Sequence, residues 1–446
     1  MEKSTFYYKE MLRISIPILL SSFTSTLLGV AAIPILGHHS VSAMAISSIA
    51  TSGSMIFISM LLISFTGYRI LCSKELGRED LKQANIIFNN NAIFSLFLSF
   101  LFMLITFFIP ENIINLLIKE NHHEQYLVKS YLKISAISYP FIAVINLIFT
   151  AFSLQKKTIY VFYISIIMNL TGVVLSCFFV YGKFGIKPFG VLGIAWAMLV
   201  ENIIGFALAI SFYIKKDKTF TIDIRTFSII QLKKIFYISA PAIISTLLDY
   251  FANFIIYSQM WQYFGEEILS AGRICYTIIL LYFTTIISLN SGFMVMGGRS
   301  LGRNNIKEFL SYFKYSKRLL FYSSIITATI LLISLNQLLL QITSFEHIRK
   351  IVFYPLVIVA ISMPIISCAY HSASSLRLIE KIKIDMLCNI FSIWIVQIPL
   401  TFLLSVYFDL DLLGVSLAFL IYQFCYGILN NYFFKKFCKI SIQDLR

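Results

Sequence analysis

The sequence predicts an all-α membrane protein with twelve transmembrane helices in two six-helix lobes that are related by an internal repeat. Hydrophobic residues make up 58% of the 446 positions and charged residues only 13%, whereas a soluble domain averages about 45–50% and about 25%. Apolar stretches long enough to span a membrane recur along the whole chain. Short motifs of the first half return in the same order in the second half.

A transmembrane helix needs ~20 mainly apolar residues, and the chain offers one such stretch after another. No hydrophilic stretch is long enough to form a soluble domain. The expected spans are 13–36, 44–69, 89–109, 130–153, 159–181, 189–213, 235–262, 268–297, 318–341, 351–376, 384–407 and 411–433.

The net charge of +15 is a topology signal. When the connections are assigned alternately to the two sides, most of the 36 lysines and arginines lie on the side of the N-terminus. The opposite side holds only Lys119, Lys129, Lys133, Lys183, Lys187, Arg349 and Lys350. This asymmetry predicts that both termini are cytoplasmic. Because no basic patch stands apart from these loops, we expect no nucleic-acid partner.

The internal repeat is carried by four motif pairs with nearly constant spacing. The pairs are 14–17 with 238–241, 76–78 with 301–303, 136–140 with 360–364, and 193–197 with 414–418. They predict an N-terminal lobe (1–214), a cytoplasmic linker (215–234) and a C-terminal lobe (235–446). Two of the pairs include prolines that can bend a span.

The ordered motifs resemble the multidrug and toxic compound extrusion (MATE) family. The resemblance rests on the Leu-Gly-Arg turns at 76–78 and 301–303, on 181–185 followed by 190–193, and on Gly37 followed by 40–45. It implies a cation-coupled antiporter that exports small organic compounds from a central cavity against H⁺ or Na⁺. The same superfamily includes flippases of lipid-linked precursors, which stay an alternative.

Other classes of protein find little support in the sequence. No GxxxxGK[ST] motif is present, which argues against ATP-driven transport by this chain alone. The seven cysteines lack metal or disulfide spacing. Neither clustered histidines nor paired carboxylates indicate an enzyme. We therefore expect a monomeric transporter at the cell membrane, in contact with lipid, without metal or cofactor; a non-transporting receptor is a further alternative.

Asp249 is the first candidate for cation coupling or substrate binding, because an ionisable residue deep in a span is expensive to insert. Asn253 and Tyr257 follow at helical spacing, so the three share one helix face. By resemblance, an acid after the same proline (Pro241) contributes to the cation site of the C-terminal lobe. A protonated aspartate bonded to a neighbouring helix is the structural alternative.

Glu201 and Arg273 are the other ionisable residues within spans. Glu201 has no counterpart among the acids typical of the family; it is a second proton carrier, a partner for a cationic substrate, or a buried structural acid. Arg273 either extends to the membrane interface or faces the cavity, where it pairs with Asp249 or an anionic substrate group. His371, beside Tyr370, is a packing residue or a titrating group.

Several positions depart from the family pattern. Ala32, Gly172, Ser176 and Ile366 stand where the family often has acidic or polar side chains. The cation site of the N-terminal lobe is therefore largely absent, and the C-terminal site retains one acid. A single carboxylate is a poor cage for Na⁺ but is sufficient for a proton, so we expect H⁺ coupling through Asp249.

Overall fold

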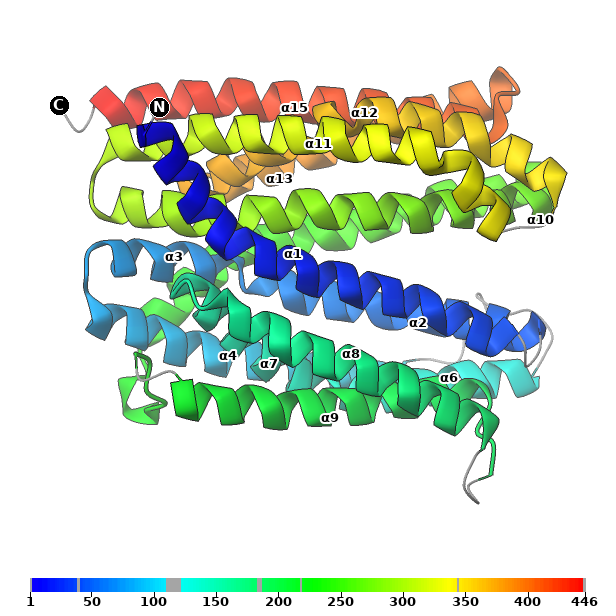
Figure 1. Ribbon diagram of the computed structural model, residues 1–446, viewed down its shortest axis with the longest axis horizontal. Coiled ribbons are helices and arrows are strands. Elements are labelled where there is room, and N and C mark those ends of the chain that lie inside the picture. Colours follow the sequence, from blue (N-terminus) through cyan, green and yellow to red (C-terminus); the bar gives the residue numbers. More distant parts are fainter. Residues whose placement is uncertain are drawn as a thin grey trace. The chain divides into compact units, whose positions relative to one another are not determined.

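The computed structural model describes residues 2–37, 41–109, 122–182, 187–216, 219–342 and 345–443, and these residues are almost entirely helical (Figure 1). The elements are α1 (Glu2–Gly37), α2 (Val41–Ser64), α3 (Thr66–Gly77), α4 (Leu81–Phe107), α6 (His122–Ile137), α7 (Tyr139–Leu154), α8 (Thr158–Tyr181), α9 (Val191–Lys216), η1 (Ile224–Thr226), α10 (Ile229–Gly302), α11 (Ile306–Ile342), α12 (Glu346–Leu378), α13 (Ile382–Ile390), η2 (Phe391–Gln397), α14 (Ile398–Thr401), η3 (Phe402–Tyr407) and α15 (Asp411–Gln443). The all-α membrane fold class is confirmed.

Among the described residues, ten helical stretches are long and apolar enough to cross a membrane, or eleven if α6 and α7, bent by 41° at Ser138, count as one span. These eleven correspond to the second to twelfth expected spans. The first expected span lies within α1, where the side chains of residues 27–37 fall outside the described part. The expected interruption between 262 and 268 is not observed, since α10 is a single helical element that contains two spanning stretches, Ile229–Asn253 and Ile278–Gly302.

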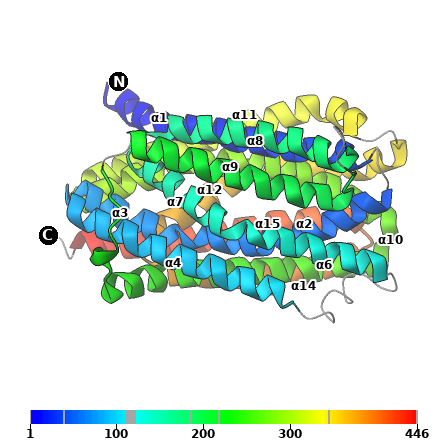
Figure 2. The ribbon, with the colours of Figure 1, turned by 90° about the horizontal axis from the view of Figure 1, so that it is seen from below.

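The chain forms two compact units. One unit comprises Pro17–Ile243, and the other comprises Met1–Ile16 together with Ile244–Arg446. In the first, α8 packs along α9; in the second, α12 packs along α15 (Figures 1 and 2). The chain thus passes from one unit to the other inside α1 and inside α10, next to Pro17 and close to Pro241.

The repeat is visible in backbone geometry at the two Leu-Gly-Arg turns. Glu79 and Asn304 both adopt a positive φ, 64° and 55°. The next residue caps the following helix in each case: the Asp80 carboxylate accepts from the Gln83 N–H at 2.9 Å, and the Asn305 amide oxygen accepts from the Glu308 N–H at 3.0 Å. A short polar side chain at the N-cap satisfies a helix N–H that has no partner within the helix. The same turn chemistry therefore joins equivalent helices in both halves.

A second repeated contact fixes the first part of each half. The Ser239 hydroxyl donates to the Ser64 carbonyl at 2.6 Å and accepts from the Gly67 N–H at 3.1 Å. In the other unit, the Ser15 hydroxyl donates to the Leu289 carbonyl at 3.0 Å and accepts from the Gly292 N–H at 3.1 Å. Glycine permits these close helix crossings, because it carries no Cβ.

The linker is held against α4 by three asparagines. Asn85, Asn89 and Asn90 exchange side-chain hydrogen bonds with the backbone and hydroxyl groups of residues 221–228. Phe220 is buried and stacks on Phe88, with ring centroids 5.1 Å apart. The described part of the linker is thus a fixed component of the unit Pro17–Ile243.

Candidate functional site

Asp249 lies partly buried on α10, and a neutral amide bonds to its carboxylate. The Asn389 amide of α13 donates to Asp249 Oδ1 at 2.7 Å. The same Nδ2 donates to the Ser245 hydroxyl at 2.8 Å, one helical turn before Asp249. Asn389 therefore connects α13 to the face of α10 that carries the predicted acid.

Tyr422 of α15 completes this group. Its hydroxyl donates to Asn389 Oδ1 at 2.9 Å, and the side chains of both residues are buried. The amide thus accepts from α15 on its oxygen side and donates to α10 on its nitrogen side. We call Ser245, Asp249, Asn389 and Tyr422 the carboxylate cluster.

A buried ion pair adjoins the carboxylate cluster. Arg377 Nε, near the end of α12, donates to Asp385 Oδ2 at 2.6 Å, and the two side chains are 19% and 5% exposed. Tyr426 donates to Asp385 Oδ1 at 2.7 Å and stacks on Tyr422, with ring centroids 6.1 Å apart. Since Asp385 compensates the guanidinium charge, Arg377 is not a dedicated counterion of Asp249.

Of the other residues predicted to act with Asp249, the structure describes the side chain of Asn253 only. Asn253 is exposed, and its amide donates to the backbone carbonyl of Asp249 at 2.9 Å rather than to the carboxylate. Tyr257 and Arg273 belong to α10, but their side chains lie outside the described residues. The sequence reasoning missed Asn389 and Tyr422; the only available signal was a polar residue within each of two apolar spans.

Glu201 lies in the other unit, where α9 faces α8. A Cβ added to Gly172 would collide with Glu201 Oε2 and would lie 2.7 Å from its Cδ. The carboxylate therefore occupies the space that a side chain at position 172 would need. Ser176 donates to the Gly172 carbonyl at 2.8 Å, so its hydroxyl is engaged within α8.

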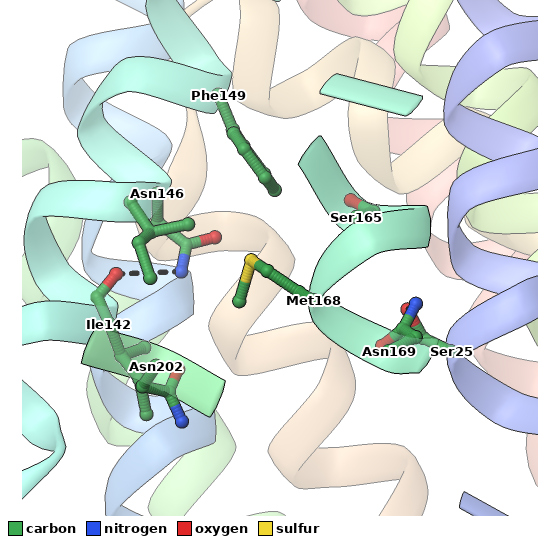
Figure 3. Close-up of a pocket in the computed structure, with 9 residues that line it drawn as sticks. Ser25, Ile142, Asn146, Phe149, Ser165, Met168, Asn169 and Asn202 are labelled. Carbon is green, nitrogen blue, oxygen red and sulfur yellow. Dashed lines mark hydrogen bonds between the residues drawn. The ribbon is translucent and has the colours of Figure 1, made fainter. Parts of the chain in front are cut away.

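A cavity of about 140 Å³, lined by both polar and apolar side chains, lies one helical turn from Gly172. Figure 3 shows Met168 at its centre, with Asn146, Asn169, Asn202, Ser25 and Ser165 around it. Each amide is tied locally: Asn146 donates to the Ile142 carbonyl, Asn169 to the Ser25 hydroxyl, and Asn202 to the Met198 carbonyl. The cavity lining carries no formal charge among the residues that the structure describes.

His371 and Ile366 are packed in the protein interior. His371 is fully buried between the rings of Phe293 and Phe313, at centroid distances of 4.6 and 4.8 Å, and its Nε2 lies 3.1 Å from the Phe313 carbonyl. Ile366 is 1% exposed and belongs to the hydrophobic core of its unit. Ala32 lies outside the described side chains.

Comparison with known proteins places these features in a family. The sequence profile of the family MatE matches residues 17–178 and 241–403, one segment in each half. A curated relative, the probable multidrug resistance protein NorM of Thermotoga maritima, is 21% identical over 418 residues, which cover 91% of this chain and 87% of the relative.

Solved structures share the fold. A mutant form of the MATE transporter VcmN of Vibrio cholerae superimposes with a TM-score of 0.87 at 14% identity, covering 98% of both chains. A transporter of the MOP superfamily from Pyrococcus furiosus, described as having a binding pocket of reverse polarity, gives a TM-score of 0.86 at 18% identity and covers 97% of this chain and 96% of its own. At such identities, the likeness carries the fold alone.

Proposed function

The chain belongs to the MatE family, whose members are transporters and not enzymes, and from this premise we propose that it exports small organic compounds across the cell membrane in exchange for protons. The two relatives named NorM and YoeA, 21% and 20% identical, are both described as probable multidrug resistance proteins. Alternating access of the binding site to the two sides of the membrane is the mechanism that the fold supports.

Asp249 is proposed as the proton carrier. Its carboxylate lies within the spanning stretch Ile229–Asn253 and receives a hydrogen bond from the neutral Asn389 amide. The nearby Arg377 is paired with Asp385. A carboxylate in a membrane without a dedicated counterion is a functional candidate by default. It can bind and release a proton while its hydrogen-bond partners stay in place. This carboxylate, held by an uncharged amide, is the observation that carries the proposal.

Glu201 is proposed as a second acidic group of the transport cycle, in the unit Pro17–Ile243. It faces Gly172, a position at which the family pattern often has a polar or acidic side chain, and no ion pair involves it among the described residues. Its carboxylate would carry a proton or pair with a cationic substrate. Asn253 and Tyr257, which follow Asp249 at helical spacing, are proposed as substrate contacts, and so is Arg273 of the next expected span.

The remaining features follow from the charge pattern. We propose that both termini lie in the cytoplasm, because the side with most lysines and arginines is the one that holds the termini. We also propose that the protein acts as a monomer in the cell membrane. The flippase alternative depends on Arg273, which would attract an anionic headgroup if it faced the site. Transbilayer movement of a fluorescent lipid-linked pyrophosphate in proteoliposomes, lost in Arg273→Ala, would support the flippase and count against drug export.

The test of proton coupling compares the wild type with Asp249→Asn in proteoliposomes. The Asn variant keeps an Oδ1 that accepts from Asn389, so the local structure is preserved while the titrating group is removed. We expect organic-cation uptake driven by a pH gradient in the wild type and its loss in Asp249→Asn. Asp409→Asn, which removes an exposed carboxylate in the connection before α15, serves as the matched control. Equal flux in the wild type and in Asp249→Asn would refute the role of Asp249.

A further inference from the structure

The orientation of the Asn389 amide within the carboxylate cluster bears on ion selectivity. Asn389 turns its NH₂ group to Asp249 Oδ1 and Ser245 Oγ, at 2.7 and 2.8 Å, and turns its oxygen to the Tyr422 hydroxyl at 2.9 Å. A carboxylate only accepts hydrogen bonds, and an amide offers donors on one side and an acceptor on the other. The observed orientation is thus the one that a charged Asp249 requires.

This orientation suits a proton and opposes a metal cation. Hard cations bind through oxygen lone pairs, and Asn389 points its NH₂ hydrogens, not its oxygen, at the Asp249 carboxylate. A protonated Asp249 keeps an oxygen that accepts from Asn389, so proton uptake leaves the hydrogen bond intact. For Asn389 to join Asp249 as a ligand of Na⁺, the amide would have to rotate by half a turn.

Tyr422 opposes that rotation. If the amide turned, its NH₂ would face the Tyr422 hydroxyl, and the hydroxyl hydrogen would lose its acceptor in a buried position. Leaving a buried donor without a partner is costly. The other titratable groups around the cluster are engaged elsewhere: Asp385 with Arg377 and Tyr426, and Arg377 also over the ring of Tyr370.

We propose that Asn389, held in this orientation by Tyr422, is the residue that makes the Asp249 site select a proton over Na⁺. Asn389 and Tyr422 are positioning residues that act through Asp249. The inference rests on the proposed role of Asp249 in coupling.

Two variants test the inference by ion selectivity rather than by total activity. Asn389→Asp replaces the amide with a second carboxylate next to Asp249 and Ser245. Tyr422→Phe removes the hydroxyl that fixes the amide and leaves the stack on Tyr426. We expect both variants to gain uptake driven by a Na⁺ gradient at equal pH and to bind Na⁺ about tenfold more tightly than the wild type. Asn389→Asp adds a charged oxygen ligand, and Tyr422→Phe frees the amide to turn its oxygen toward Asp249. Binding is read by isothermal titration calorimetry with NaCl against KCl.

Tyr426→Phe is the matched control, because its hydroxyl bonds to Asp385 and not to Asn389. We expect it to keep the ion selectivity of the wild type; an equal gain of Na⁺ coupling in this variant would overturn the role of Tyr422. If Asn389→Asp gains Na⁺ binding and Tyr422→Phe does not, the amide determines selectivity but Tyr422 does not hold it. If neither variant binds Na⁺, the inference is wrong while proton coupling stands.

A different set of results would refute the proposed function. Wild-type flux that is unaffected by Asp249→Asn removes Asp249 from coupling, whatever the other variants do. Wild-type flux driven by Na⁺ and lost in Asp249→Asn would keep Asp249 as the carrier and would overturn selection of the proton by Asn389.

Discussion

Gly172 and Glu201 share one space between α8 and α9, because the carboxylate of Glu201 lies where a Cβ at position 172 would stand. The absence of a side chain on one helix is thus matched by an acid on its neighbour. The sequence alone could not reveal this relationship, since positions 172 and 201 belong to different spans and no periodicity links them.

Moving the carboxylate from position 201 on α9 to position 172 on α8 tests whether transport needs an acid in the space that the two positions share. We expect Glu201→Gln to reduce pH-driven uptake and Glu201→Ala to reduce it similarly. The double variant Glu201→Ala with Gly172→Asp should recover much of the loss, because the new carboxylate enters the space that the old one left. The measurement is initial uptake in proteoliposomes at matched protein density.

Gly205→Ala is the control for this exchange. It crowds the side chain of Met168 at the same helix pair without touching a carboxylate, and a flexible methionine can move aside. A normal rate in Gly205→Ala, together with no recovery in the double variant, would show that a carboxylate in this space is not sufficient for transport. A normal rate in Glu201→Gln would leave Glu201 as a structural residue.

The buried pair of Arg377 and Asp385 predicts a strong effect on stability. Removing one partner leaves a buried charge without compensation, so Arg377→Ala should lower the free energy of unfolding by about 3–5 kcal/mol. The double variant Arg377→Ala with Asp385→Ala should regain a large part of this loss. Thermal unfolding in detergent, followed by size-exclusion chromatography, measures both.

A surface pair provides the comparison. Lys350 and Glu346 are 74% and 70% exposed and 2.9 Å apart, and exposed pairs contribute little. Lys350→Ala should therefore leave the unfolding temperature unchanged. If Arg377→Ala behaves in the same way, burial does not strengthen the pair of Arg377 and Asp385.

Much of the fold could be predicted from hydropathy and motif spacing, because the membrane demands long apolar helices and the repeat preserves its turns. The site could be predicted only in part. Asp249 stood out as a charge in an apolar span, but Asn389 and Tyr422 are common residue types whose meeting depends on helix packing. Arg377 and Asp385 flank a short turn, so in sequence they read as charges of a connection rather than as a buried pair.

The two glycines at the repeated helix crossings predict a matched loss of stability. A Cβ at Gly67 would lie 2.6 Å from Ser239 Oγ and 2.8 Å from the Ile235 carbonyl oxygen; a Cβ at Gly292 would lie 2.5 Å from Ser15 Oγ and 2.6 Å from the Met11 carbonyl oxygen. Such overpacking costs about 1–3 kcal/mol. Gly67→Ala and Gly292→Ala should each lower the unfolding temperature.

Gly53→Ala is the matched control for the crossings, because its Cβ would meet only the end of the Leu132 side chain at 3.2 Å. We expect a small change there. A small change at Gly67 and Gly292 as well would show that the helices at these crossings can move apart at little cost in stability. The contacts of Ser239 and Ser15 would then not fix the first part of each half.

The asparagine clamp on the linker predicts resistance to proteolysis. Arg225 lies in η1, between the segments that Asn89 and Asn90 hold. Asn89→Ala with Asn90→Ala removes the donors and acceptors that fix residues 223–228, so trypsin should cut after Arg225 much faster than in the wild type. Gln83→Ala, on the same helix, is the control, because the Gln83 side chain has no hydrogen-bond partner among the described residues, while its backbone N–H bonds to Asp80. Equal cleavage in the double variant and the control would show that stacking of Phe220 on Phe88, and not the clamp, holds the linker.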